Sequence, residues 1–295
     1  PKGRKLYGYL LGNRHLPRKR CDASRGYALP WRALTGMRVM GVLNVTPDSF
    51  SDGGLHDAVD AAIAHGLALL DDGADIIDIG GESTRPGAIP VDEATEITRA
   101  VPVVEGILAE RPGTVISIDT SKAAVADAAA AAGASILNDV TASLEHAAAR
   151  NGLGWIAMHA GGSGQVLSHD PGSRDVIGEV ADFLAYAVER GRAAGVRDIW
   201  IDPGFGFGKT FDQNLDLLAN LDDFVAIAPT VVAVSRKRSL GVLHARSDGL
   251  DEPTSVDDRL EAALAIATWG GLLGADLVRV HDVRATVHAV GVIAR

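Results

Sequence analysis

The sequence lacks several features that would each point to a particular class of protein. Cys21 is the only cysteine, so an intramolecular disulfide, a cysteine zinc cage and a dithiol redox pair are excluded. The uncharged stretch from Ala262 to Ala275 is shorter than the roughly 20 apolar residues that span a bilayer, and no apolar N-terminal run resembles a signal peptide. Lys and Arg number 28 against 38 Asp and Glu, which argues against a general nucleic-acid binder. We therefore expect an enzyme of the cytoplasm that has no membrane segment.

The basic residues that are present gather at the N-terminus. Residues 1–36 carry nine Lys and Arg and a single acid, Asp22, while residues 37–295 carry 19 basic against 37 acidic residues. We expect residues 1–36 to form a basic arm that lies on an acidic body, with a nucleic-acid-binding tail as the alternative. Residues 37–295 are expected to form one catalytic domain.

From Met37 onward, short apolar runs alternate with longer Ala-rich stretches. The runs are nearly continuous and rich in β-branched residues, as in strands that are buried on both faces of a parallel sheet. They cover residues 37–44, 74–80, 114–119, 134–139, 154–159, 198–202, 230–235 and 275–280. Eight strand–helix units match a (β/α)8 TIM barrel of the α/β class. The competing doubly wound fold needs G-x-G-x-x-G after its first strand, where this chain reads VTPDSFSDGG, so we predict the barrel.

Each predicted strand closes on hydrogen-bonding or ionisable residues. The active site of such a barrel lies at the carboxyl ends of its strands, so these side chains should line one polar cup. A single Asp in such a place is more often a structural cap, and the prediction therefore depends on the whole set. The set consists of Asn44, Asp78, Glu82, Asp119, Asn138, Asp139, His159, Asp202, Ser235, Arg236, Lys237, Arg279 and His281.

Four of these residues, Asp119, Asn138, Asp202 and Lys237, come from four different strands. Their carboxylates accept from paired N–H groups, the amide both donates and accepts, and the ammonium donates to a carbonyl or imine nitrogen. The combination suits a flat heterocycle with amidine-like donors. An internal ion-pair network is the alternative.

Cationic donors predict an anion site beside this floor. Arg85 follows the second strand, and Arg279 and His281 end the eighth, where barrels of this kind commonly hold phosphate. For Arg279 alone, a salt bridge with Asp282 is an equal alternative.

Two other anion or metal sites can be weighed from the sequence. The segment DPGFGFGKT at 202–210 is not a P-loop, because three residues rather than four separate Gly204 from Gly208. No closely spaced His/Cys set indicates zinc. Magnesium that is shared between Asn44 and substrate phosphates would leave little trace in a sequence, and it stays open.

Seven motifs resemble, in order and spacing, those of the dihydropteroate synthase family. The resemblance covers about residues 37–295 and leaves residues 1–36 outside. It implies a transferase of folate biosynthesis that condenses (7,8-dihydropterin-6-yl)methyl diphosphate with 4-aminobenzoate, uses Mg2+, is a sulfonamide target and is usually a homodimer. The motifs are GVLNVTPDSFSDGG at 41–54, DIGGESTRPGA at 78–88, SIDT at 117–120, NDV at 138–140, DPGFGFGK at 202–209, VSRKRSLG at 234–241 and RVHDV at 279–283.

The resemblance also implies roles for individual residues. Departure of pyrophosphate leaves positive charge on the pterin methylene, so a site that holds the leaving group and faces the cation with a carboxylate, Asp52, assists the reaction. Catalysis is implied for Asp52, Lys237 and Arg85. The implied pterin ligands are Thr84, Asp119, Asn138, Asp202 and Lys237, the pyrophosphate ligands Arg85, Arg279 and His281, the aminobenzoate contacts Phe50, Pro86 and Ser235, and the metal ligand Asn44.

Two other functions share parts of this pattern. A pterin-binding methyltransferase module would have the barrel and the floor residues, but it would not need the DSFSD, STRPG and SRK segments together. A non-catalytic pterin-binding paralogue would be expected to lose Asn44, Arg85 or Lys237, and all three are present. The uncharged stretch 262–275 is the candidate for a buried homodimer face.

Overall fold

The computed structural model describes residues 36–45, 55–83, 89–160 and 175–293. The expected basic arm lies outside this part of the chain except for its last residue, so its placement stays a prediction. Five residues with predicted roles also lie outside the described residues: Phe50, Asp52, Thr84, Arg85 and Pro86.

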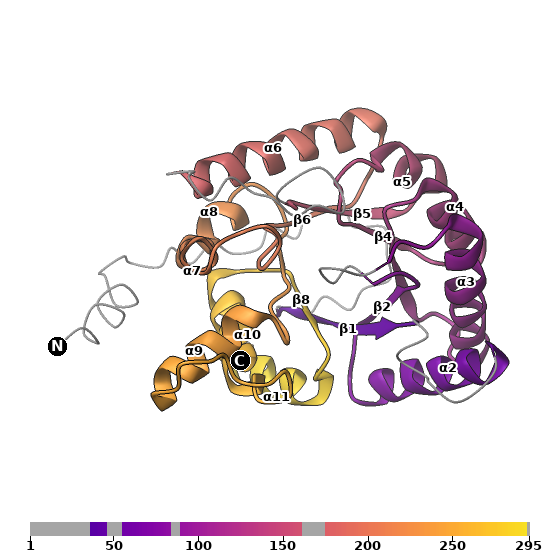
Figure 1. Cartoon of the computed structure of the whole chain (residues 1–295). Coiled ribbons are helices and arrows are strands. Elements are labelled where there is room, and N and C mark those ends of the chain that lie inside the picture. The colour runs from indigo at the N-terminus through magenta and orange to yellow at the C-terminus, as the bar shows by residue number, and fades with distance from the viewer. Residues whose placement is uncertain (1–35, 46–54, 84–88, 161–174, 294–295) are drawn as a thin grey trace.

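Eight parallel strands form the predicted barrel (Figure 1). They lie in the order β6-β5-β4-β3-β2-β1-β8-β7, so β1 is hydrogen-bonded to both β2 and β8. Every strand falls within a range that the sequence predicts, which confirms the (β/α)8 prediction. The strands are β1 Arg38–Asn44, β2 Ile76–Gly80, β3 Val115–Asp119, β4 Ile136–Asp139, β5 Gly154–Met158, β6 Ile199–Asp202, β7 Val231–Val232 and β8 Leu277–Val280.

Helices follow the strands and surround them, with α2 to α6 on one side of the barrel and α7 to α11 on the other (Figure 1). In the part of the chain described here, none of the helices combines the length and the apolar character needed to cross a bilayer. The helices are α2 Leu55–Asp71, α3 Glu93–Glu110, α4 Ala123–Ala131, α5 Glu145–Asn151, α6 Val176–Ala194, α7 Phe211–Ala219, α8 Leu221–Val225, α9 Arg238–Asp248, α10 Leu260–Leu273 and α11 Val283–Ile293.

Alternate residues of the strands fill the interior of the barrel. Side chains alternate between the two faces of a strand, so every second residue of a strand points into the barrel. The inward side chains therefore form layers along the barrel axis. The layer near the amino ends of the strands is apolar, and Val115 of β3 packs against it, partly buried. Its members are Met40, Ile76, Ile136, Ile156, Trp200, Val231 and Leu277. The outward faces of the strands pack beneath the helices in a larger core, so the amino-terminal half of the barrel is closed by an apolar plug.

The junction between β6 and β7 is the seam of the barrel. In the described part of the chain, one isolated bridge, from Ile201 to Thr230, pairs these strands, and Ile201 N donates to Pro229 O over 2.9 Å. The sequence predicts a longer seventh strand. A turn from Val234 to Lys237 ends it early, with Arg236 at a φ of 61°. The barrel is therefore nearly closed, with one seam that few backbone hydrogen bonds hold.

Candidate functional site

Polar side chains form the next inward level above the apolar plug. Asp78, Asn138, Asp202 and Arg279 each follow an interior apolar residue of the same strand by two positions, so they point into the barrel at its carboxyl end. Asp78, Asn138 and Asp202 are buried. The predicted polar cup therefore has a floor that contains two carboxylates, an amide and a guanidinium.

Arg279 connects three strands of this floor. Its Nε donates to Asp78 Oδ2 over 2.6 Å and its Nη2 donates to Asp119 Oδ2 over 2.7 Å. Asn138 Nδ2 donates to the same oxygen of Asp78 over 3.1 Å. The Oδ1 of Asp78 and the Oγ of Ser117 are buried and have no partner among the described residues. Such groups are ordinarily satisfied by water or a ligand, so the floor has hydrogen-bonding capacity to spare.

The shared guanidinium governs the charges of this network. Burial raises the pKa of Asp119 to about 7; Arg279 opposes that rise and the carboxylate of Asp78 adds to it. Burial alone would lower the pKa of Arg279, but the attraction of Asp78 and Asp119 raises it above its ordinary value. Arg279 is therefore cationic throughout the physiological range, while Asp119 titrates close to neutrality.

A second network joins β6, the glycine-rich segment 203–209 and the start of α9. Gly204 N donates to Asp202 Oδ1 over 2.7 Å. Lys237 Nζ donates to Phe205 O and lies 4.2 Å from the centroid of the Phe207 ring. Burial raises the pKa of Asp202 and lowers that of Lys237 to about 8, and in each case the charge of the other residue counteracts the shift. Asp202 and Lys237 are thus brought together as opposite charges that share one site.

Ser235 and His281 form a third group at the ends of β7 and β8. The backbone N and the Nδ1 of His281 each lie 3.2 Å from Ser235 Oγ, and Ser235 is buried. One predicted aminobenzoate contact, Ser235, and one predicted pyrophosphate ligand, His281, thus touch each other just beyond β7 and β8.

The end of β1 offers oxygen atoms that suit magnesium. Asn44 lies beside Gly80 of β2 in the strand register. A Cβ added at Gly80 would lie 3.7 Å from Asn44 Oδ1 and 3.9 Å from Asp119 Oδ2, so the missing side chain leaves a cradle between an amide oxygen and a carboxylate oxygen. Mg2+ prefers such ligands, completed by water and phosphate. The Oδ1 of Asn44 therefore fits the ion as a ligand, whereas Asp119 Oδ2 already accepts from Arg279.

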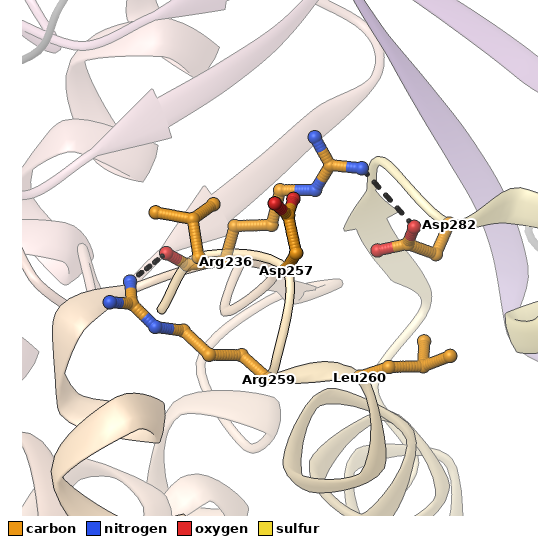
Figure 2. Close-up of a pocket in the computed structure, with 6 residues that line it drawn as sticks. Arg236, Asp257, Arg259, Leu260 and Asp282 are labelled. Carbon is orange, nitrogen blue, oxygen red and sulfur yellow. Dashed lines mark hydrogen bonds and ion pairs between the residues drawn. The ribbon is translucent and has the colours of Figure 1, made fainter. Parts of the chain in front are cut away.

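Arg236, the residue between Ser235 and Lys237, lines a cavity of about 100 Å³ (Figure 2). Arg236 Nη2 donates to Asp282 Oδ1 over 3.2 Å, and Arg259 Nη1 donates to Arg236 O over 2.8 Å. Val256, Asp257 and Leu260 complete the lining. Asp282 thus pairs with Arg236, whereas the two carboxylates bound to Arg279 come from β2 and β3.

Two members of the predicted cup anchor loops. Asp139 accepts from the backbone N of Thr141, Ser143 and Leu144 and from Trp155 Nε1. Glu82 accepts from Val91 N and pairs with Lys122. These contacts give both acids a structural role, as expected for a polar residue that closes a strand.

Sequence reasoning gave Lys209 no role, yet it lies inside the site. Its Nζ is 3.0 Å from His159 Nδ1 and also approaches three backbone carbonyls. The sequence feature that could have indicated a role for Lys209 is its position at the end of a glycine-rich segment between a strand and a helix. This feature is a weak predictor, because a lysine in such a place is ordinarily solvated.

One outer cluster resembles a metal site by composition alone. His244, Asp258 and Glu261 hold potential ligand atoms within 4.8 Å of one another. However, His244 Nδ1 lies 2.8 Å from Asp258 O, and its Nε2 accepts from Ala262 N over 3.2 Å. The backbone engages both ring nitrogens, so we assign no metal to this cluster.

Comparison with known proteins shows the family to which the chain belongs. The family described as "Pterin binding enzyme" matches residues 40–281. The dihydropteroate synthase of Mycobacterium leprae is 44 % identical over 274 residues, which cover 88 % of this chain and 94 % of that protein. The Xanthomonas albilineans dihydropteroate synthase with 4-aminobenzoic acid matches with a TM-score of 0.80 at 43 % identity, covering 88 % of this chain and 93 % of that one. A Yersinia pestis dihydropteroate synthase in a sulfonamide drug complex matches with a TM-score of 0.78 at 42 % identity, covering 88 % and 94 %.

Fold and floor together define a barrel enzyme that binds a flat, polar heterocycle at the carboxyl ends of its strands. The chain belongs to the dihydropteroate synthase family of pterin-binding enzymes. It is therefore a transferase of folate biosynthesis.

Proposed function

We propose that the protein joins (7,8-dihydropterin-6-yl)methyl diphosphate to 4-aminobenzoate, with release of pyrophosphate and formation of 7,8-dihydropteroate. The observation that carries the proposal is the inward polar level at the carboxyl ends of the strands, in a chain of this family. Asp119, Asn138, Asp202 and Lys237 contribute to this floor. They offer the acceptors and donors that a pterin ring requires, with Thr84 as a fifth ligand.

The leaving group is held by cations. We assign Arg279, His281 and Arg85 to the diphosphate. The bonds of Arg279 to Asp78 and Asp119 use two of its five N–H groups, so the guanidinium can also donate to phosphate oxygens. Asn44 would hold Mg2+ in the cradle beside Gly80. When bound, the ion offsets the charge of the departing pyrophosphate.

The arylamine enters opposite the leaving group. Ser235, with Phe50 and Pro86, would contact 4-aminobenzoate, and Asp52 would face the positive charge that develops on the methylene. The amine is neutral at pH 7, so its attack requires no strong base. Sulfonamides resemble 4-aminobenzoate, and we propose that they compete for the same place; a relative is solved with such a drug.

One assay tests this function directly. Incubation with the pterin diphosphate, 4-aminobenzoate and Mg2+ should yield dihydropteroate and pyrophosphate, and chelation of the metal should abolish product formation. A pterin-binding methyltransferase module or a non-catalytic paralogue would bind the pterin and form no product. Binding without product would therefore overturn the proposal.

Two properties of the whole protein are also proposed. The lone cysteine suits a reducing compartment, and we place the protein in the cytoplasm. The exposed Leu272 of α10 and Val292 of α11 offer apolar surface for a homodimer. Light scattering after size-exclusion chromatography should give twice the 30.7 kDa mass of the chain.

A further inference from the structure

Lys209 closes the glycine-rich segment 203–209, and four acceptors surround its ammonium. Its Nζ lies 3.0 Å from His159 Nδ1, 3.1 Å from His159 O, 2.9 Å from Gly204 O and 3.2 Å from Phe207 O. The ammonium has three hydrogens and no lone pair, so it can only donate to these atoms. One side chain thus joins the end of β5 to the segment that follows β6.

The backbones of these two segments touch where Lys209 joins them. Gly204 has a φ of +71°, and a Cβ at this position would lie 1.8 Å from His159 O. Only glycine allows this approach. The segment is therefore pressed against β5, and the carbonyl oxygens of His159 and Gly204 both accept from Lys209 Nζ. The cation attracts the negative ends of both carbonyl dipoles and so holds the two backbones together.

The same segment contacts both charged residues of the β6–α9 network. Gly204 N donates to Asp202 Oδ1, Phe205 O accepts from Lys237, and the Phe207 ring faces the Lys237 ammonium. A shift of this segment would therefore move a hydrogen-bond donor away from Asp202 and an acceptor away from Lys237.

We propose that Lys209 is a positioning residue for pterin recognition, because it clamps the glycine-rich segment to His159 and thereby fixes Asp202 and Lys237. The inference builds on the proposed function, in which Asp202 and Lys237 contact the pterin.

Electrostatics links the clamp to Asp202. Burial lowers the pKa of Lys209 to about 7, with Asp202 opposing the shift and Lys237 adding to it. Burial raises the pKa of Asp202, and Lys237, Gly204 N, Lys209 and Arg279 of β8 all counteract that rise. Among the described residues, the titratable groups around Lys209 are His159 at the end of β5, Asp202 of β6 and Lys237 just before α9. Removing the Lys209 charge should raise the pKa of Asp202 and weaken pterin binding at acidic pH.

The test compares Lys209→Met, which removes the charge and the donors, with Lys209→Arg, which keeps both. Calorimetry would measure binding of the pterin diphosphate from about pH 5.5 to 9. Lys209→Met should bind about tenfold more weakly or worse at pH 6, where wild-type Lys209 is charged because its pKa is about 7. The acidic limb of its binding profile should move to higher pH. Lys209→Arg should recover most of the affinity. Arg246→Met, which removes an outer cation stacked on Phe211, is the matched control and should bind like the wild type.

Several outcomes would overturn the inference. One is a folded Lys209→Met variant with wild-type affinity. Another is a loss of affinity that comes with a lower melting temperature, an unmoved acidic limb and no recovery in Lys209→Arg, which would mean general destabilisation. If Lys209→Met does not fold, Lys209→Gln replaces it, because glutamine keeps two N–H donors without the charge. Wild-type pterin affinity in Lys209→Gln would also overturn the inference. Failure of the wild type to bind the pterin diphosphate would instead contradict the proposed function.

Discussion

The Nε of Arg279 lies 2.6 Å from the Oδ2 of Asp78, although the two residues are 201 positions apart in the chain. The carboxylate of Asp78, which is fully buried, thus orients the guanidinium of Arg279. The Nη2 of the same guanidinium donates to Asp119. The residue assigned to the pyrophosphate is thus also the counter-ion of two floor carboxylates. A single substitution at Arg279 acts on folding and on the site together.

Replacement of Arg279 by Met should destabilise the fold markedly. It leaves Asp78 and Asp119 buried without their cation, and breaking such a pair by removing one partner costs about 3 to 5 kcal/mol. Urea denaturation at pH 7 would measure the loss. Arg150→Met is the control, because it breaks an exposed pair with Asp127 and should change stability little. Equal losses in the two variants would show that the floor network contributes no more than a surface pair.

His281→Ala should discriminate between two pterin ligands. If His281 donates to the diphosphate, the variant loses affinity for the pterin diphosphate and keeps most of its affinity for the bare hydroxymethyl pterin. Calorimetric titration with both ligands measures the two effects. An equal loss for both ligands would assign His281, through its contact with Ser235 Oγ, to the shape of the site instead.

Asp202→Asn should weaken pterin binding at least about tenfold, because it turns an acceptor into a donor that faces ring N–H groups, at a cost of roughly 1 to 3 kcal/mol. Calorimetry measures the affinity, and circular dichroism confirms the fold. The Oδ1 acceptor for Gly204 N can be kept by the amide oxygen, so the segment 203–209 should stay in place. Unchanged affinity in a folded variant would remove Asp202 from the pterin floor.

The raised pKa of Asp119 has a consequence for stability. In the folded state this carboxyl titrates near 7, against about 3.9 in an unfolded chain. The stability that the residue contributes is therefore fully present below about pH 4 and is lost as pH rises through about 7. Asp119→Asn should flatten this decline, because the amide does not titrate and still accepts from Arg279. Urea denaturation of both proteins at intervals from pH 4.5 to 8 tests the difference; parallel curves would contradict the assignment.

Gly204→Ala should cost more stability than Gly249→Ala. Both glycines have a φ of +71°, but a Cβ at Gly204 would meet His159 O at 1.8 Å, whereas at Gly249 nothing lies within 4 Å. The second variant thus measures the backbone strain alone, about 1 kcal/mol. Thermal melts should place Gly204→Ala well below Gly249→Ala, and pterin affinity should fall only in Gly204→Ala. Equal melting temperatures would show that β5 and the segment 203–209 can separate without cost.

The strands could be predicted because each one is marked by the residues of its own short segment. A run such as residues 76–80 is apolar and β-branched, which is the pattern expected of a strand that is buried on both faces. The seventh strand is shorter than predicted, since its apolar residues continue into a turn at Val234–Lys237 that hydrophobicity does not report. The polar residues of the floor were predictable for the same reason: each one closes a recognisable strand.

The pairing of the charges was not predictable from the sequence. Asp276 and Asp282 are the carboxylates nearest to Arg279 in the sequence, each three positions away. The arginine nevertheless binds Asp78 and Asp119, which approach it only when β8 lies beside β1. Lys209 was missed for a similar reason. Its acceptors at His159 are 50 positions away, and local spacing carries no trace of them.

The weakly paired seam between β6 and β7 implies that the bound substrate also stabilises the barrel. Asp202 ends β6 on one side of the seam, and Lys237 follows β7 on the other. By contrast, regular parallel pairing through β3, β2 and β1 connects the strands of Asn138 and Arg279. A pterin diphosphate that contacts all four residues would link the two strands that meet at the seam, β6 and β7, where backbone pairing is weakest. Occupancy should then suppress opening of that seam, so that amide hydrogens of the β6–β7 region exchange with solvent more slowly once the pterin is bound.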